Sequence, residues 1–343
     1  MVDVRQDTSA HSLHQEEYAA TLASILEARA RIQPYAHVTP VLTCSSIDAE
    51  VGRNLHFKCE NFQKSGAFKF RGACNAVFSL TEETAKKGVV THSSGNHAAG
   101  LALAAQIRGI PAHIVLPKNA PACKIANVRR YGGSVVTCEP TMESREQTAK
   151  KVQDKTGAVF ISSSSDERVM SGQGTVAVEF LEQVHSLDAI FTPISGGGLT
   201  AGVALASKAL KPTIKIFAAE PLGADDAAQS KATGRIVTLS QVNTIADGLR
   251  TSSLGALNWP VVRDLVEEVI TVSEPEIVHA MRLCYSRLKI VVEPSAAVGL
   301  AAVLSQRFQE NPHHLNCINI GVVLSGGNVD LDALWSSISQ SIQ

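Results

Sequence analysis

The 343-residue sequence is poor in several kinds of residue, and each shortage narrows the class of protein. Aromatic residues make up 5% of the chain and charged residues 18%, and the formal net charge is only -1. A chain this close to neutral has no general attraction to nucleic acid or to an anionic membrane. No run of 18 apolar residues is free of polar breaks, and the polar stretch 1–17 lacks the apolar core of a signal peptide. These absences favour a cytoplasmic protein that binds small molecules.

The cysteines are few and scattered. There are seven, an odd number, and no two have C-x-x-C spacing. This pattern argues against a disulfide framework and against a zinc site, and it favours buried, reduced thiols. Cys123, beside Pro121 and Lys124 in a polar segment, is the thiol to test for oxidation.

Apolar runs of strand length alternate with helical patterns along most of the chain. Helical spacing is seen at 16–31, 95–108 and 202–210, and the strand-like runs are Leu55–Cys59, Gly88–Thr91, Ala112–Leu116, Ser134–Cys138, Ala158–Ile161, Ala189–Ile194, Lys215–Ala219 and Ile318–Leu324. This alternation predicts an α/β fold with parallel sheets covered by helices. The length exceeds one ordinary core, so we expect two domains, with 80–161 forming a separate set of βα units.

The segment Ser65–Gly72 reads Ser-Gly-Ala-Phe-Lys-Phe-Arg-Gly and presents one lysine, Lys69. A lysine beside an aromatic residue, with small residues before it and Arg-Gly after it, can be held partly desolvated and can lose its proton. Those properties suit a lysine that forms an imine. The alternative is an ordinary surface lysine.

Three later stretches place a polar, glycine-containing turn directly after a strand. Residues 93–97 read Ser-Ser-Gly-Asn-His and open a helix, which makes a site for a carboxylate. Residues 195–199 read Ser-Gly-Gly-Gly-Leu and leave backbone amides open to a phosphate group. Residues 325–328 read Ser-Gly-Gly-Asn, which by itself indicates only a tight turn.

The second of these turns also imitates a dinucleotide fingerprint. Gly196, Gly198 and Ala201 satisfy G-x-G-x-x-A, and Glu220 ends the next strand about twenty residues later. An NAD-dependent dehydrogenase is therefore an alternative from a different class of enzyme.

In combination, F-K-x-R-G, S-S-G-N-H, S-G-G-G-L and L-S-G-G-N resemble, in order and spacing, the fold-type II pyridoxal-phosphate enzymes of the serine racemase and threonine dehydratase family. The resemblance covers nearly the whole chain after about residue 25. It implies an α/β fold of two parallel-sheet domains. Residues 1–81 and 162–343 would form a large cofactor-binding domain, and residues 82–161 a small mobile domain that closes over the substrate.

The resemblance also assigns the cofactor site. Lys69 would hold pyridoxal 5'-phosphate as an imine, and Phe68 would line its ring. Asn96 would bond the ring hydroxyl, and Ser325 would face the pyridine nitrogen. The phosphate would be bound by Gly196, Gly197, Gly198 and Leu199. Ser195 stands where the family often has another glycine.

Inversion at Cα requires an acid/base group on each face of a planar carbanion. By resemblance these groups are Lys69 on one face and Ser94 on the other. The same carbanion can lose a β-leaving group, so dehydration is expected as a side reaction on serine-like substrates. An L-serine or threonine ammonia-lyase is accordingly a second hypothesis.

Two features bear on the choice of substrate, in addition to the turn formed by Ser93, Ser94, Gly95, Asn96 and His97. Arg145 aligns with a racemase arginine near the substrate, and a guanidinium suits a second carboxylate. The run Ser163, Ser164 and Ser165 offers donors without bulk and resembles the triple-serine loop of invertebrate aspartate racemases that arose within this family. We therefore expect an aspartate racemase, with serine racemase as the alternative.

Two further sites follow from the same resemblance. The side chains of Glu220 and Asp226 and the carbonyl of Ala224 match a divalent-cation site with the hard oxygen ligands that Mg²⁺, Ca²⁺ or Mn²⁺ prefers. Eukaryotic members also bind an adenine nucleotide at a dimer interface, at positions matched here by Ser45, Ser46, Lys64 and Ser65. We thus expect a homodimer with ATP or AMP as effector.

Overall fold

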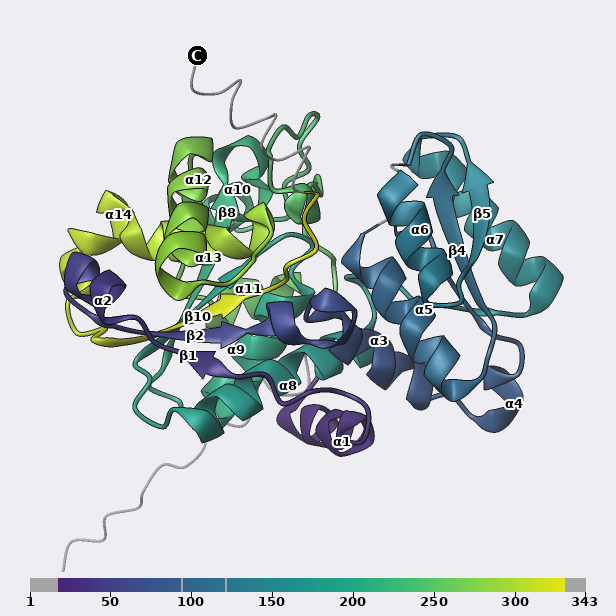
Figure 1. Ribbon diagram of the computed structural model, residues 1–343, viewed down its shortest axis with the longest axis horizontal. Helices are drawn as coiled ribbons and strands as arrows, with labels where there is room; N and C mark the ends of the chain where they lie inside the picture. The colour runs from purple at the N-terminus through teal and green to yellow at the C-terminus, as the bar shows by residue number, and fades with distance from the viewer. Residues whose placement is uncertain (1–17, 94, 121, 331–343) are drawn as a thin grey trace, which may run out of the picture.

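Two sheets organise the chain in the computed structural model, which describes residues 18–93, 95–120 and 122–330, and in 122–124 the backbone alone (Figure 1). The six-stranded sheet has, in spatial order, β1 (Val41–Leu42), β2 (Asn54–Cys59), β10 (Asn319–Leu324), β7 (Ala189–Pro193), β8 (Lys215–Pro221) and β9 (Glu268–Val272). The four-stranded sheet has β5 (Ser134–Cys138), β4 (Ala112–Pro117), β3 (Val89–Thr91) and β6 (Val159–Phe160). All pairs are parallel except β1 with β2.

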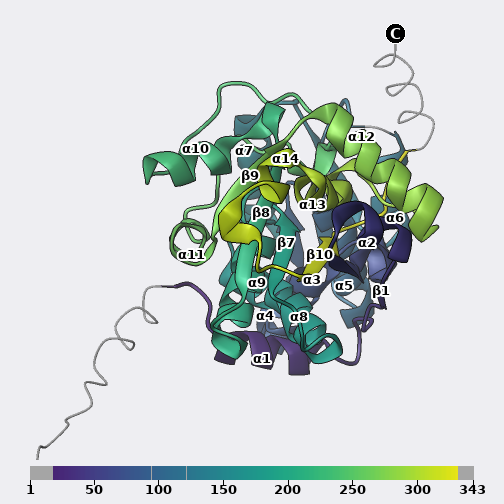
Figure 2. The ribbon, with the colours of Figure 1, turned by 90° about the vertical axis from the view of Figure 1, so that its left-hand side faces the viewer.

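Helices cover both faces of the six-stranded sheet. One face packs against α1 (Leu22–Ile32), α8 (Glu167–Gln183), α9 (Gly198–Leu210) and α11 (Trp259–Leu265). The other packs against α2 (Ser45–Val51), α12 (Glu274–Leu283), α13 (Pro294–Leu304) and α14 (Gln306–Gln309). Figure 2 shows α10 (Asp226–Thr233) and α11 at the β9 edge.

Strand β7 shows why the strands are continuously apolar. Ala189 and Phe191 enter the core beneath α13, and Ile190 between them enters the core beneath α8 and α9. A parallel strand covered on both faces has no solvent-facing side, so its sequence lacks polar alternation.

The four-stranded sheet carries α5 (Asn96–Arg108), α6 (Ala122–Arg130) and α7 (Met142–Thr156). Between the two sheets lies α3 (Lys69–Phe78), which packs against α5 on one side and α8 on the other; the short α4 (Glu82–Ala85) follows it. The contact of α3 with α8 is close because both helices have glycine there. A Cβ on Gly172 would lie 2.5 Å from the Cα of Gly72.

A buried network of four charges fixes α3 in place. The Arg71 guanidinium makes paired hydrogen bonds of 2.7–2.8 Å to the carboxylates of Glu60 and Glu179, and Lys58 Nζ donates to Glu179 at 2.8 Å. Arg71 and Lys58 are fully buried. Two cations and two anions balance one another, which a buried charge requires. The network joins α3 to α8 and to strand β2.

The α/β class and the parallel sheets are confirmed. The helix expected at 16–31 begins only at Leu22, and the helix expected at 202–210 begins earlier, at Gly198. Strands β1 and β9 were not predicted. Within the described residues, no helix combines the length and the hydropathy needed to cross a bilayer.

Candidate active site

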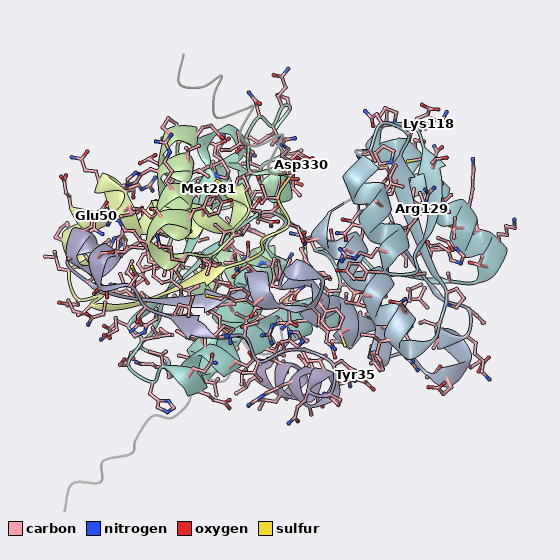
Figure 3. The ribbon with its side chains drawn as sticks, in the orientation of Figure 1. Tyr35, Glu50, Lys118, Arg129, Met281 and Asp330 are labelled. Atoms are coloured by element: carbon pink, nitrogen blue, oxygen red, sulfur yellow. The ribbon has the colours of Figure 1, made fainter. Side chains whose placement is uncertain are left out.

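A cavity of about 770 Å³ lies between the two sheets. Its lining includes fourteen of the residues predicted from sequence, namely Phe68, Lys69, Ser93, Gly95, Asn96, His97, Arg145, Ser163, Ser164, Gly196, Gly197, Gly198, Leu199 and Ser325. Asp330, another lining residue, is labelled in Figure 3 on the side of the six-stranded unit that faces the four-stranded one. Ser94 lies outside the described residues, as does the side chain of Cys123.

Lys69 is the first residue of α3, and its side chain extends into the cavity from the six-stranded side. The backbone N–H of Phe68 donates to the carbonyl of Ser325 at 3.0 Å, which holds the start of the helix against the end of β10. The Lys69 amine lies 5.1 Å from the centre of the Phe68 ring and donates to the carbonyl of Ser163 at 2.9 Å. Burial lowers the pKa of Lys69 from 10.5 to about 8, because removal from water disfavours the ammonium.

The glycine turn after β7 lies opposite. Gly197 has φ of +92°, a backbone conformation that favours glycine, and it immediately precedes the thirteen-residue helix α9. A Cβ on Gly196 would lie 2.5 Å from the Cβ of Ser164, so the turn is closely packed on that side. Ser195 Oγ and Thr251 Oγ1 are hydrogen-bonded at 2.8 Å. The turn therefore presents the N-terminus of α9 to the cavity.

These features fit pyridoxal phosphate. A desolvated amine suits imine formation, and a side-chain-free turn at the start of a helix suits a phosphate. Ser325, only 3% exposed, lines the same cavity at the end of β10. Lys69, Gly196 to Leu199 and Ser325 come from three separate stretches of sequence, and the fold brings them together around one space.

The turn after β3 reaches the cavity from the four-stranded side. Asn96 Nδ2 donates to Glu293 Oε1 at 2.8 Å, and Asn96 Oδ1 accepts from Asn328 Nδ2 at 2.9 Å. Sequence reasoning missed Glu293, which is buried at the start of α13, and gave no role to Asn328. The only signal for Glu293 was an acid directly before a proline at a helix start. These two bonds fix the orientation of the Asn96 amide.

His97 is buried and neutral. Burial lowers its pKa to about 3, and the nearby Lys69 acts in the same direction. Nε2 lies 3.2 Å from the carbonyl of Ile161, which can only accept, so Nε2 carries the hydrogen. Nδ1 is buried without a partner and is consequently a free acceptor.

Arg145 on α7 and the serine loop complete the predicted lining. The Nε of Arg145 is buried without a hydrogen-bond partner. Ser163 meets the Lys69 amine through its carbonyl, not its hydroxyl. Ser165 is exposed and does not line the cavity. The loop thus presents fewer hydroxyls to the cavity than its sequence indicates.

The predicted cation ligands lie elsewhere, after β8. Glu220 and Asp226 are each 1% exposed. Glu220 accepts hydrogen bonds from the backbone N–H groups of Ala227 and Ala228, and Asp226 Oδ2 is buried without a partner. Burial raises the pKa of Asp226 to about 7 and that of Glu220 well above its usual range, and the negative charge of Asp226 raises the latter further. Two uncompensated buried carboxylates with an unpaired oxygen fit a cation. No cluster of three or more His, Cys, Asp or Glu suited to a metal is found in the described residues.

The residues assigned to a nucleotide lie on two separate elements and outside the cavity lining. Ser45 and Ser46 begin α2, and Lys64 and Ser65 lie in a 3₁₀ turn (Lys64–Gly66) that precedes α3. The Oγ of Ser65 is buried without a partner. The carbonyl of Ser65 accepts from Asn328 Nδ2 at 2.7 Å, which places this turn one residue away from the Asn96 amide.

Comparison with known proteins gives consistent matches. The model of the family described as pyridoxal-phosphate dependent enzyme matches residues 32–326. Serine racemase of Arabidopsis thaliana is 63% identical over 96% of this chain and 99% of its own length. The structure of maize serine racemase superposes with a TM-score of 0.91 at 58% identity, covering 95% of this chain and 98% of that one.

Two other solved structures are informative. A pyridoxal 5'-phosphate-dependent aspartate racemase superposes with a TM-score of 0.88 at 39% identity, covering 92% of this chain and 98% of its own. A bacterial-type threonine deaminase, described as that of T.th., superposes with a TM-score of 0.85 at 42% identity, covering 90% of this chain and 99% of its own.

The expectation of an aspartate racemase is wrong. Relatives named serine racemase are 46–63% identical over at least 92% of this chain, well above the 39% of the aspartate racemase. The run of serines misled because only part of the loop lines the cavity. The dehydrogenase alternative fails as well, since the Glu220 carboxylate is engaged by the backbone after its own strand.

Proposed function

Because the chain belongs to the pyridoxal-phosphate dependent enzymes, we propose that it interconverts L- and D-serine. The observation that carries this proposal is the 63% identity to a serine racemase over 96% of the chain, joined to a Lys69 amine that opens on the cavity. The cofactor is pyridoxal 5'-phosphate, which when bound withdraws electrons from the Cα–H bond of an amino acid. The residues around Lys69 have the remaining tasks.

Lys69 is the proton-transfer group on one side of the substrate. With a pKa of about 8, its amine is present in both protonation states near neutral pH, so it can accept a proton and return it. The carbonyl of Ser163 orients the amine. Phe68 covers the amine and limits its contact with water.

We assign the opposite side to Ser94. Replacing Ser94 by Ala should abolish inversion and spare elimination, because elimination needs removal of the Cα proton on one side only. Ser93→Ala is the matched control and should retain both reactions. Equal loss of inversion and elimination in Ser94→Ala would contradict the assignment.

Substrate recognition is assigned to the four-stranded side. Arg145 Nε has no partner, and His97 Nδ1 is a free acceptor, so both can bind polar groups of the substrate. We propose that residues 82–161 move as a small domain and bring Arg145 toward Lys69. The main support is the exposure of α7, in which Ala149 is the only buried residue.

A lyase reaction is the second candidate. The likeness to a threonine deaminase supports it, since the same proton removal from a substrate with a β-hydroxyl can end in loss of water. Serine would then give pyruvate and ammonia. The ratio of D-serine to pyruvate distinguishes the two activities.

The test is chiral chromatography of the holoenzyme incubated separately with L-serine and D-serine, with pyruvate measured in parallel. We expect each enantiomer to form the other, with pyruvate as a by-product. L-Aspartate serves as the comparison substrate and should turn over at least about tenfold more slowly, the discrimination of about one mismatched polar contact. Pyruvate without any D-serine would identify a lyase and overturn the proposal.

We also propose a structural Mg²⁺ bound by Glu220, Asp226 and the carbonyl of Ala224. Its support is the pair of buried carboxylates described above. At 100 times its Kd, Mg²⁺ should stabilise the fold by about 2.7 kcal/mol, read as an increase in Tm. The increase should vanish in Asp226→Asn, while Asp225→Asn, an adjacent acid, should retain it. An unchanged Tm in the wild-type protein would contradict the site.

A homodimer with an adenine nucleotide between subunits remains a proposal. Val38 and Phe62 are exposed large apolar side chains, as is Val291, whose carbonyl binds Asn61 beside Phe62. Sedimentation with and without ATP would test both parts. Phe62→Glu should shift the protein to monomer, and Lys64→Ala should weaken the response to ATP without altering the oligomeric state.

A further inference from the structure

One side chain outside the cavity joins the two loops that hold the cofactor and the lysine. Asn258 is fully buried in the turn before α11 and does not line the cavity. Its Nδ2 donates to the carbonyl of Ser164 at 2.6 Å and also to the carbonyl of Gly196. A single amide nitrogen thus uses both of its hydrogens to bridge two separate loops.

Each of those carbonyls belongs to a functional loop. Ser164 follows Ser163, whose carbonyl receives the Lys69 amine. Gly196 lies in the glycine turn that opens α9. The distance between the amine's acceptor and the phosphate-binding turn is therefore set through Asn258.

The same segment supports the glycine turn at two more points. Gly255 N donates to the Gly196 carbonyl at 3.0 Å, and Thr251 is bonded to Ser195. The packing leaves little slack, because a Cβ on Gly197 would lie 3.0 Å from the Cβ of Asn258. The segment 251–258 acts as a brace behind the turn.

The orientation of Asn258 has a cost that points the same way. Its Oδ1 is buried without a partner, so the fold leaves an acceptor desolvated to obtain two donated bonds. Neither an aliphatic residue nor an ionised carboxylate of the same size could donate them.

We propose that Asn258 is a positioning residue that holds the phosphate-binding turn in register with the carbonyl that orients Lys69. It touches neither cofactor nor substrate and acts through Gly196 and Ser164. The cofactor affinity of the chain should depend on it more than the stability of the fold does.

The experiment measures the Kd of pyridoxal phosphate for the apoenzyme by fluorescence, the ³¹P resonance of the bound phosphate, and the Tm of the apoenzyme. Asn258→Ala and the isosteric Asn258→Asp should raise the Kd about tenfold or more, corresponding to loss of about one charge-assisted or two neutral hydrogen bonds. The ³¹P resonance should move. Asn75→Ala is the control, because Asn75 is also buried and donates to a carbonyl, that of Arg168, away from the cavity.

In the control, Tm should fall while the Kd changes by less than about twofold. If Asn258 variants lose Tm like the control with an unchanged Kd and ³¹P resonance, the residue is merely structural and the proposal fails. Should those variants not fold, Thr251→Val tests the brace from its other end, with a Kd raised about threefold expected and an unchanged Kd overturning the proposal. Cofactor binding needs no turnover, so the result is independent of whether the enzyme is a racemase or a lyase.

Discussion

Helices α7 and α8 follow consecutive stretches of the chain, yet one has a single buried residue in fifteen and the other has thirteen in seventeen. Helix α8 is enclosed by α1, α3 and α9, whereas α7 covers one face of a four-stranded sheet. The cavity lies between these two environments. Its six-stranded side holds Lys69 on a helix anchored by buried charges, and its four-stranded side presents Arg145 from an exposed helix. Chemistry is placed on the fixed side and recognition on the side that can move.

The sharpest way to break this contrast is to loosen the fixed side. Arg71→Met should reduce the free energy of unfolding by about 3–5 kcal/mol, because Glu60 and Glu179 would keep buried charges with only Lys58 to balance them. Arg168→Met, which removes a partly exposed pair with Asp166, is the control and should cost about 0–1 kcal/mol. Urea unfolding of both variants decides the matter; similar losses would mean that the network does not anchor α3.

The opposite change tests the exposed side. Arg145→Ala should lower kcat/KM for serine about 100-fold, mainly through KM, because a charged hydrogen bond to the substrate is lost. Stability should change by no more than about 0.5 kcal/mol, as expected for a largely exposed helix. Arg130 lines the cavity from α6 but is exposed, so Arg130→Ala is the matched control and should leave KM within about twofold. A large loss of stability in Arg145→Ala would contradict a recognition role.

The smallest effect concerns the Lys69 amine itself. Only its neutral form captures pyridoxal phosphate, and burial lowers its pKa from 10.5 to about 8. The capture rate of the apoenzyme should therefore rise about tenfold per pH unit below pH 8 and level off above it. Stopped-flow absorbance gives the profile, with N-acetyl-lysine as the control that continues to rise toward 10.5. A plateau near 10.5 in the protein would show that Lys69 is not desolvated.

The sequence determined the α/β class, the parallel strands and the identity of the cofactor residues. Strand runs such as 189–194 are apolar on both faces, and a glycine turn at a helix start has few other uses, so these patterns carry their own physical meaning. Strand β1, two residues long, and β9 left no comparable pattern. The choice of substrate was misread at Ser163 to Ser165, because a run of hydroxyls does not reveal which of them face a cavity.

Only the tertiary structure decided the contacts between distant segments. Glu293 lies 197 positions from Asn96, and Asn258 lies 94 from Ser164, yet each pair is hydrogen-bonded. No local pattern marks a residue whose partner is chosen by how two sheets pack. Short-range spacing determines what a turn can bind, whereas the arrangement of the helices between the sheets determines which groups meet there.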